Sequence, residues 1–408
     1  MRLNEPMTNP PPPALDIERL RADTPGCASV THLNNAGSAL PPAIVTQTQI
    51  DHLRLEESIG GYEAHAHAQG RVDAVYDSVA ALAGCRADQV ALVESATAAW
   101  SRGFAAIHNT RPLSAGDRVL ASSSEYASNV LPLLQLARSR GVTVEFIPDD
   151  TEGCTDVDAF AAMLGPDVAL VAVNQCPSQN GLVNDVAAIG AALRTSGSDA
   201  WYLVDACQSF GQLPVSASAI GADFLSATGR KFIRGPRGTG FLVASDRALT
   251  ELEPFPLDLH SATWQPAGFD LAPGATRFES WEKSYAAMLG LGAAIDYALD
   301  CGLESIAARI QHLAAYARAS LAAIPGVTVL DRGTHPGGIV TITHSAIAAP
   351  DLAARIKAGG VNVSLSTPDY SRIDFDAHGI AGLVRVSPHA YNTTEEIDRL
   401  AAIVESLT

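Results

Sequence analysis

The sequence has 408 residues, of which 47% are hydrophobic, and it carries a formal net charge of −17. This length allows about two domains of ~100–200 residues with a large core. The acidic balance disfavours nucleic acids and anionic membrane surfaces as partners, because both present negative phosphates.

The cysteine, histidine and hydropathy patterns argue against a disulfide-rich, metal-binding, membrane-spanning or secreted protein. The six cysteines form no CxxC pair and no metal spacing, which agrees with a reducing compartment. His65 and His67 are the only close histidine pair, and i,i+2 spacing does not place them on one helix face, so no metal site is expected. No run of ~18 apolar residues predicts a membrane span, and the N-terminus lacks a secretory apolar region. A cytoplasmic protein that binds no membrane is expected.

Residues 1–31 are predicted to form an N-terminal arm. It contains four consecutive prolines, Pro10 to Pro13. Such a run is stiff, and the ends of a chain are often poorly ordered. We therefore expect the proline run to make this arm stiff and poorly ordered.

Residues 32–280 are predicted to form a large α/β domain. Helical spacing occurs at 71–83, 97–107, 130–140 and 185–195, and short apolar strands at 90–93, 118–121, 142–147, 168–173, 201–204, 223–226 and 240–244. Short apolar strands that alternate with helices are typical of a mostly parallel sheet covered on both faces. The loop before 240–244 is too short for a helical crossover, which predicts one antiparallel strand.

Residues 281–408 are predicted to form a smaller α+β domain, completed by the N-terminal segment. A long helical region at 285–324 precedes strands at 338–343, 361–364 and 382–386, with helices at 351–358 and 394–407.

Lysine usage is the most informative chemical feature, because the chain contains only Lys231, Lys283 and Lys357. An enzyme that binds an aldehyde as a Schiff base must keep a lysine, since a guanidinium group cannot replace it. Lys357 lies late in an amphipathic helix, where a lysine favours the helix dipole, and Lys283 suits a surface position. Lys231 follows a strand and precedes a glycine-rich turn, where ligands of open α/β sheets bind.

Two more strand ends supply matching groups. Asp205 ends the strand at 201–204, where it could cap a helix or pair with the pyridine nitrogen of pyridoxal 5′-phosphate (PLP) and keep the ring electron-accepting. Gln208 could hydrogen-bond the phenolic oxygen of that cofactor. Ser95-Ala-Thr97 precedes a helix and suits either an N-cap or a phosphate site. Thr228 and Arg230 would add a hydroxyl and a cation to the phosphate. Together these groups predict a PLP site.

The segments VDACQSFGQLPV (204–215) and FLSATGRKFIRGPRGTGFL (224–242) resemble the class V aminotransferase family of fold-type I PLP enzymes. The similarity runs from the segment at 32–37 to the segment at 385–391. The family includes cysteine desulfurases, selenocysteine lyases, isopenicillin N epimerase and the C–S lyase of ergothioneine biosynthesis. The resemblance implies a seven-stranded, mostly parallel sheet between helices, PLP as cofactor and a small amino-acid substrate.

The resemblance also implies roles for individual residues. Lys231 would hold PLP as a Schiff base, with Asp205 on the pyridinium and Gln208 on the phenolic oxygen. The phosphate would be held by Ala96, Thr97, Thr228 and Arg230, the last where many relatives have histidine. Ser178 would lie beside the ring, and Arg385 would bind the substrate carboxylate in a bidentate fork. Asn35 falls in a substrate-proximal segment. The segment at 277–282 would reach the neighbouring subunit's phosphate, which implies a homodimer with shared active sites.

Two departures from the desulfurase pattern narrow the function. Relatives place a histidine over the cofactor ring in the segment that matches 125–129, where this chain has Ala127, with Tyr126 as a candidate for stacking. Relatives also carry a nucleophilic cysteine in the stretch that matches 361–369, which here contains none. Cys176 and Cys207 lie near the predicted site, but small buried cysteines are usually packing residues. Persulfide-forming desulfurase activity is therefore not expected.

Three reactions remain compatible with these residues. After Lys231 removes the α-proton, the substrate can lose a β-substituent, be reprotonated on either face, or transfer its amino group. We expect β-elimination of the C–S lyase type, with epimerisation and then transamination as alternatives. A regulator that had lost its chemistry would lack the lysine or the acid, and both are present.

Overall fold

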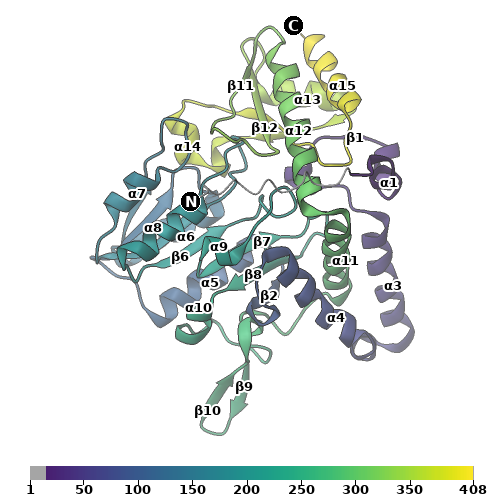
Figure 1. Ribbon diagram of the computed structural model, residues 1–408. Coiled ribbons are helices and arrows are strands. Elements are labelled where there is room, and N and C mark those ends of the chain that lie inside the picture. The colour runs from purple at the N-terminus through teal and green to yellow at the C-terminus, as the bar shows by residue number, and fades with distance from the viewer. Residues whose placement is uncertain (1–14, 408) are drawn as a thin grey trace, which may run out of the picture.

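The computed structural model describes residues 15–407, so the expectation for Pro10–Pro13 lies outside the described residues. Figure 1 shows a large sheet enclosed by helices and a smaller sheet at the C-terminal end. Short elements at the start of the described chain lie beside the smaller sheet. They are α1 (Ile17–Ala22), β1 (Thr31–His32) and α2 (Asn35–Ser38).

Seven strands form the large sheet in the order β2-β8-β7-β6-β5-β3-β4. Their bounds are β2 (Val90–Val93), β3 (Arg118–Ser122), β4 (Thr143–Ile147), β5 (Val168–Asn174), β6 (Trp201–Asp205), β7 (Phe224–Thr228) and β8 (Gly240–Ala244). Strand β8 pairs antiparallel with β2 and β7, and the other pairs are parallel. The prediction of a mostly parallel sheet with one antiparallel strand is confirmed.

Helices cover both faces of this sheet because its strands are apolar on both sides. In β5, Val171 and Val173 belong to one core, and Leu170 and Ala172 to the other. The first core includes residues of α4 (Gly61–Ala83), α7 (Val157–Met163), α8 (Val186–Ser196) and α11 (Tyr285–Cys301). The second includes residues of α5 (Ala96–Thr110), α6 (Ala127–Arg140) and α10 (Asp246–Glu251). Helix α3 (Ala43–Ile59) packs on α4 and α11, and the short α9 (Ala217–Ile220) lies against α8.

A four-stranded antiparallel sheet, β11-β12-β15-β14, organises the C-terminal part. It consists of β11 (Val327–Val329), β12 (Val340–His344), β14 (Ser364–Ser366) and β15 (Leu383–Val386), packed against α12 (Leu303–Ala322), α13 (Ala349–Ala358) and α15 (Thr394–Glu405). Strand β1 pairs in parallel with β13 (Val361–Asn362). The domain boundary near residue 280 stays a prediction.

The helical region predicted over 285–324 is two helices, because the chain breaks at Gly302. This glycine has φ +88° and separates α11 from α12, and the two helices are bent by 83°. No single helix among the described residues is long and apolar enough to span a membrane, although this bent pair has the combined length and composition.

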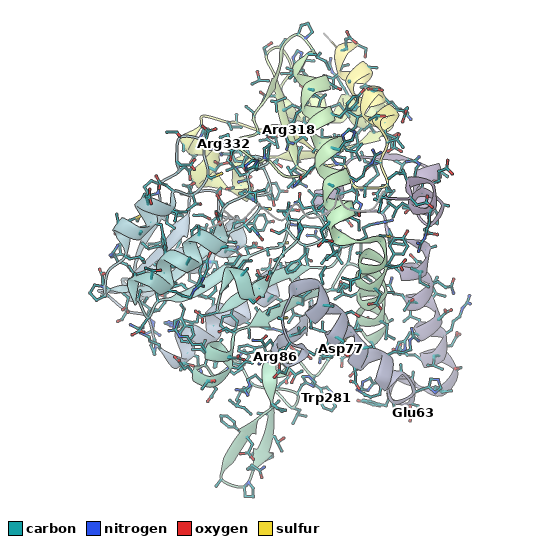
Figure 2. The ribbon with its side chains drawn as sticks, viewed as in Figure 1. Glu63, Asp77, Arg86, Trp281, Arg318 and Arg332 are labelled. Carbon is teal, nitrogen blue, oxygen red and sulfur yellow. The ribbon has the colours of Figure 1, made fainter. Side chains whose placement is uncertain are left out.

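A hairpin that the sequence reading missed extends from the body of the molecule (Figure 1). Strands β9 (Ala262–Gln265) and β10 (Gly268–Leu271) pair antiparallel around Pro266-Ala267. Trp264 on this hairpin is 86% exposed, and Trp281 on the body is 51% exposed. Figure 2 shows Trp281 on the side of the molecule from which the hairpin extends.

An ionic cluster links the C-terminal part to the large sheet. Arg332, labelled in Figure 2, contacts Asp374 of α14 (Arg372–Ala377) and lies 4.0 Å from Asp149, which follows β4. Its Nη1 also lies 2.7 Å from Nε2 of His378. The cluster therefore holds α14, and the chain that precedes it, beside the large sheet.

The turn after β6 needs a glycine, which gives a testable prediction. Gly211 has φ +87°, and an added Cβ would lie 2.3 Å from the carbonyl atoms of Phe232, next to Lys231. We expect Gly211→Ala to cost ~1–2 kcal/mol of backbone strain and a further ~1–3 kcal/mol of overpacking. Gly197→Ala is the control, because Gly197 has φ +69° but no atom within 4 Å of its Cβ. Equal melting temperatures for the two variants would contradict this account.

Candidate active site

A cavity with an empty volume of about 500 Å³ lies where the loops after β2, β5, β6 and β7 converge. Strands of a parallel sheet end at the same edge, so residues far apart in the sequence meet there. The predicted residues that line the cavity are Ala96, Thr97, Tyr126, Ser178, Asp205, Gln208, Thr228, Arg230 and Lys231.

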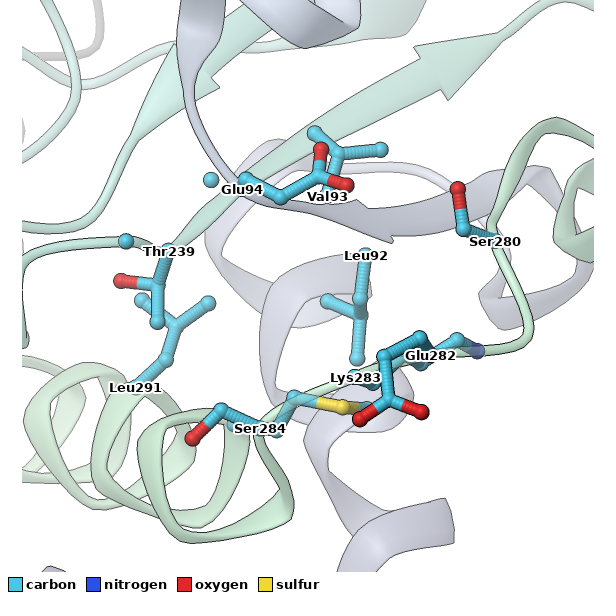
Figure 3. A pocket seen from close by; sticks show the side chains of 12 residues that line it. Leu92, Val93, Glu94, Thr239, Ser280, Glu282, Lys283, Ser284 and Leu291 are labelled. Atoms are coloured by element: carbon cyan, nitrogen blue, oxygen red, sulfur yellow. The ribbon is translucent and has the colours of Figure 1, made fainter.

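Lys231 is the only lysine in this cavity. Its side chain is buried, and burial, with the nearby Arg230 charge adding to it, lowers its pKa. A lowered pKa increases the neutral amine, the form that attacks an aldehyde. Lys283 instead contacts Glu279 and His260 beside a separate hollow shown in Figure 3. Lys357 is exposed at the end of α13.

Asp205 accepts one hydrogen bond on each carboxylate oxygen. The backbone N–H of Cys207 donates to Oδ1 at 2.8 Å, and Nδ2 of Asn129 donates to Oδ2 at 2.8 Å. The carboxylate is thus oriented and still has lone pairs for a cationic N–H donor.

A second buried carboxyl group lies behind Asp205. Nδ2 of Asn129 also donates to Glu125 at 2.7 Å, so this amide joins the two acids. Burial and the charge of Asp205 raise the pKa of Glu125 to about 7. Two negative charges in one buried network repel, so the charge of Asp205 adds to burial in favouring the protonated form of Glu125.

Gln208 leaves a buried polar atom without a partner. Its Nε2 donates to Oγ of Ser178 at 3.0 Å and to the carbonyl of Ala36 at 3.1 Å. Its Oε1 is buried and has no hydrogen-bond partner among the described residues. An unsatisfied buried group costs ~1–3 kcal/mol, so the cavity wall favours an occupant that supplies a donor.

The other end of the cavity is built for an anion. Oγ of Ser95 caps α5 by accepting from the N–H of Ala98 at 3.1 Å, and Ala96 and Thr97 form the first turn. The positive end of the helix dipole and the Arg230 guanidinium both favour negative charge here. The hydroxyl of Thr228 donates to the carbonyl of Thr239 at 3.1 Å, so it makes a hydrogen bond to the backbone of the turn before β8.

A second cavity, with an empty volume of about 510 Å³, shares Tyr126, Ser178, Gln208, Arg230 and Lys231 with the first and contains Arg385 of β15. Nη1 of Arg385 donates to the carbonyl of Ser178 at 3.0 Å, and Nη2 to Oδ1 of Asn34 at 3.4 Å. Its Nε is buried without a partner among the described residues. Burial lowers the pKa of Arg385 to about 10, which leaves it charged at neutral pH. This guanidinium can bind a carboxylate.

Asn35 and Arg277 both make hydrogen bonds within their own chain. Asn35 lines neither cavity, because its amide donates to the carbonyl of Ser387 at 2.8 Å and it joins Asn392 in a buried network. Its neighbour Asn34 contacts Arg385 instead. The guanidinium of Arg277 donates to carbonyls of its own chain, those of Ala272, Gly274 and Leu249.

Three residues at or behind these cavities were not singled out from the sequence. Asn129 lines the first cavity, Tyr370 the second, and Glu125 lies behind Asp205. Glu125 precedes α6 by two residues and Asn129 lies in the first turn of that helix, so the turn into α6 brings the two side chains together. Tyr370 lies in a short 3-10 turn without sequence periodicity, so no local signal indicated it.

No cysteine near the cavities has the properties of a nucleophile. Burial raises the pKa of Cys176 to about 12 and also raises the pKa of Cys207. A protonated thiol is a poor nucleophile. The stretch at 361–369 passes the second cavity with Ser364, Leu365 and Ser366, none of them a thiol. Among the described residues, no group of three or more His, Cys, Asp or Glu could hold a metal ion.

The donor set fits PLP: a buried amine for the aldehyde, an oriented carboxylate for the pyridine nitrogen and a helix start with a guanidinium for the phosphate. The fold and this site define the class of fold-type I PLP-dependent enzymes. The family model described as Aminotransferase class-V matches residues 30–400. The chain therefore belongs to the class V aminotransferase family, and its cofactor is PLP.

Similar proteins include desulfurases and a C–S lyase. A probable cysteine desulfurase of Methanothermobacter thermautotrophicus is 28% identical over 399 residues, which cover 96% of this chain and 98% of the relative. The apo structure of a cysteine desulfurase from Thermococcus onnurineus NA1 matches with TM-score 0.88 and 24% identity, over 97% of this chain and 99% of that chain. The structure of the cystine C–S lyase C-DES with cysteine persulfide matches with TM-score 0.82 and 22% identity, over 94% and 99%. The structural matches establish the fold.

The shared network predicts how stability depends on pH. Because the pKa of Glu125 is about 7 in the folded chain and 4.5 ordinarily, the unfolded chain binds fewer protons between these values. The contribution of the Glu125 carboxyl to the free energy of unfolding is therefore fully present below pH 4.5 and is lost as the pH rises to 7. Glu125→Gln removes this loss, which is roughly 3 kcal/mol at most. We expect the melting temperature of apo Glu125→Gln minus that of apo wild type to increase as the pH is raised from 5 to 7.5.

Glu57→Gln is the control for this experiment, since Glu57 is exposed on α3. The difference in melting temperature between Glu57→Gln and wild type should not change over the same pH range. A pH-independent difference for Glu125→Gln would show that the carboxyl is ionised throughout.

Proposed function

We propose that this protein is a PLP-dependent lyase that eliminates a sulfur leaving group from a cysteine-derived amino acid. The observation that carries the proposal is a buried lysine beside an oriented carboxylate and a carboxylate-binding arginine, in a cavity without a reactive thiol. The bound cofactor supplies an electron sink for the substrate α-carbon. The relatives named desulfurases and C–S lyase act on the same type of bond.

Each residue has one task in this proposal. Lys231 holds the cofactor covalently and, once substrate has replaced it, its neutral amine takes the α-proton. Asp205 holds the pyridine nitrogen in its protonated form, and Asn129 orients Asp205. The start of α5 and Arg230 bind the phosphate. Arg385 binds the substrate carboxylate, which orients the α-hydrogen toward Lys231.

The missing thiol distinguishes this proposal from a desulfurase that carries sulfur on the enzyme. Transfer of sulfur to the protein needs a thiolate, and Cys176 and Cys207 are the cysteines that line the cofactor cavity. Burial keeps both protonated. We therefore propose direct release of the thiol, after which water hydrolyses the remaining enamine to pyruvate and ammonia.

A homodimer with shared sites and a cytoplasmic location remain proposals. Exposed apolar side chains on α3, at the start of α4 and around the hairpin support the dimer. They are Leu53, Ile59, Tyr62, Trp264 and Trp281.

The covalent role of Lys231 is tested by the absorbance of the purified protein. We expect the band of the lysine-bound cofactor to disappear on borohydride treatment in wild type and to be absent from Lys231→Ala. Mass spectrometry should locate the reduced cofactor on Lys231. Lys283→Ala is the control, since that lysine lies outside the cavity, and it should retain the band. A band that survived in Lys231→Ala would overturn the assignment.

The reaction is tested by its products and by removal of the two thiols. Incubation with S-substituted cysteines should release pyruvate, ammonia and a thiol in equal amounts. Incubation with cystine should release pyruvate, ammonia and cysteine persulfide in equal amounts. The double variant Cys176→Ser, Cys207→Ser should keep at least half of this activity, because neither thiol takes part. A more than hundredfold loss, with sulfur found on Cys176 or Cys207 in wild type, would indicate a desulfurase. Deuterium uptake at Cα without products would indicate an epimerase, and conversion of the cofactor to its amine form a transaminase.

A further inference from the structure

Two tyrosines line the substrate cavity as a nearly parallel pair. The ring centroids of Tyr126 and Tyr370 are 6.4 Å apart, and their planes differ by 16°. Tyr126 is the N-cap residue of α6, and Tyr370 ends the 3-10 turn at 368–370. Both line the cavity that contains Arg385, and Tyr126 also lines the cofactor cavity, whereas Tyr370 does not. Tyr370 therefore belongs to the substrate side of the site.

The backbone of this pair is fixed, while the rings have room to adjust. Oγ of Ser371, which is buried, donates to the carbonyl of Glu125 at 3.0 Å, so the residues next to the two tyrosines are joined. The contacts of Arg332 with Asp374 and His378 hold the following helix. Tyr370 itself is 45% exposed.

A flat group fits between the two rings only if they move apart. Carbon atoms in contact lie ~3.5–4.0 Å apart, so a planar group between two rings needs their planes ~7–8 Å apart. The ring centroids are 6.4 Å apart, so the ring of Tyr370, which is 45% exposed, must move outward by about 1 Å or more. Stacking on an aromatic ring changes affinity by ~2- to 10-fold beyond the effect of buried area.

The charges of the cavity argue against an ionic substrate side chain. Its lining contains two guanidinium groups, Arg230 and Arg385, and no acidic residue, so a cationic side chain would be repelled. Two anions already match these two charges: the cofactor phosphate and the substrate α-carboxylate. The remaining lining beside the tyrosines includes Ser364, Leu365 and Ser366, which are uncharged.

We infer that the Tyr126–Tyr370 pair forms the side-chain subsite, and that the preferred substrates are cysteine conjugates whose sulfur carries an aromatic or heteroaromatic group. The prediction that these conjugates are cleaved rests on the proposed lyase function. The predicted preference in binding does not depend on it. A second carboxylate on the substrate, bound by Arg230, is the competing possibility.

The binding preference is tested with the holoenzyme and α-methyl amino acids, which have no α-proton and cannot react further. Binding is followed by the change in absorbance of the bound cofactor. Wild type should bind α-methyl-phenylalanine about tenfold more tightly than α-methyl-leucine. Tyr370→Leu should reduce this ratio to about one, and Tyr370→Phe, which keeps the ring, should retain it. A wild-type preference for α-methyl-aspartate, or an unchanged ratio in Tyr370→Leu, would overturn the inference.

Turnover separates this inference from the proposed function. S-benzylcysteine should be cleaved with a kcat/KM about tenfold above that of S-butylcysteine in wild type and Tyr370→Phe, but not in Tyr370→Leu. An aromatic preference in binding without release of pyruvate and thiol would overturn the lyase and leave the subsite. Cleavage of both conjugates at equal rates would overturn the subsite and leave the lyase.

Discussion

The common edge at which parallel strands end is the constraint on which this site depends. Strands β5, β6 and β7 run in the same direction, so the residues that follow them lie beside one another. Strand β2 reaches the same edge through the antiparallel β8. Asp205, Lys231 and the start of α5 each belong to a different strand end. A displaced strand would separate the acid, the amine and the anion site.

Buried charge then determines how these groups behave. The amine of Lys231 lies near the guanidinium of Arg230, and burial lowers its pKa. On the opposite side, Asn129 donates to both Asp205 and Glu125, and burial together with the Asp205 charge raises the pKa of Glu125. Desolvation favours a neutral amine and a neutral Glu125, while hydrogen bonds keep Asp205 oriented. The cavity is thus prepared for an aldehyde at one side and a cationic ring nitrogen at the other.

The C-terminal part completes the substrate side of the site. Arg385 comes from the smaller antiparallel sheet and donates to the carbonyl of Ser178, which belongs to the loop after β5. The segment before α14 brings Tyr370 to Tyr126, joined through Ser371 and Glu125. The two sheets therefore meet through hydrogen bonds at the cavity itself, and a shift of the C-terminal part would change the substrate subsite while leaving the lysine and its acid in place.

The sequence by itself determined the mostly parallel sheet, its antiparallel strand and the cofactor, because these depend on local periodicity and on residue types at strand ends. Lysine usage reduced the candidates to three, and the place of Lys231 after a strand and before a glycine-rich turn separated it from Lys283 and Lys357. Several features came only from the tertiary structure. The break at Gly302 was hidden because its neighbours continue the helical pattern, and the hairpin at 262–271 has too little buried surface for an alternating pattern. The contact of Asn34 rather than Asn35 with Arg385 also came only from the tertiary structure, because adjacent residues point in different directions.

The tyrosine pair and the Glu125–Asn129–Asp205 network likewise came only from the tertiary structure. Tyr370 meets Tyr126, and Glu125 acquires its pKa of about 7, only after distant segments pack. Ring spacing and desolvation are properties of that packing. The sequence therefore determined which chemical groups this protein possesses, and the tertiary structure decided which of them face one another and in what state of charge.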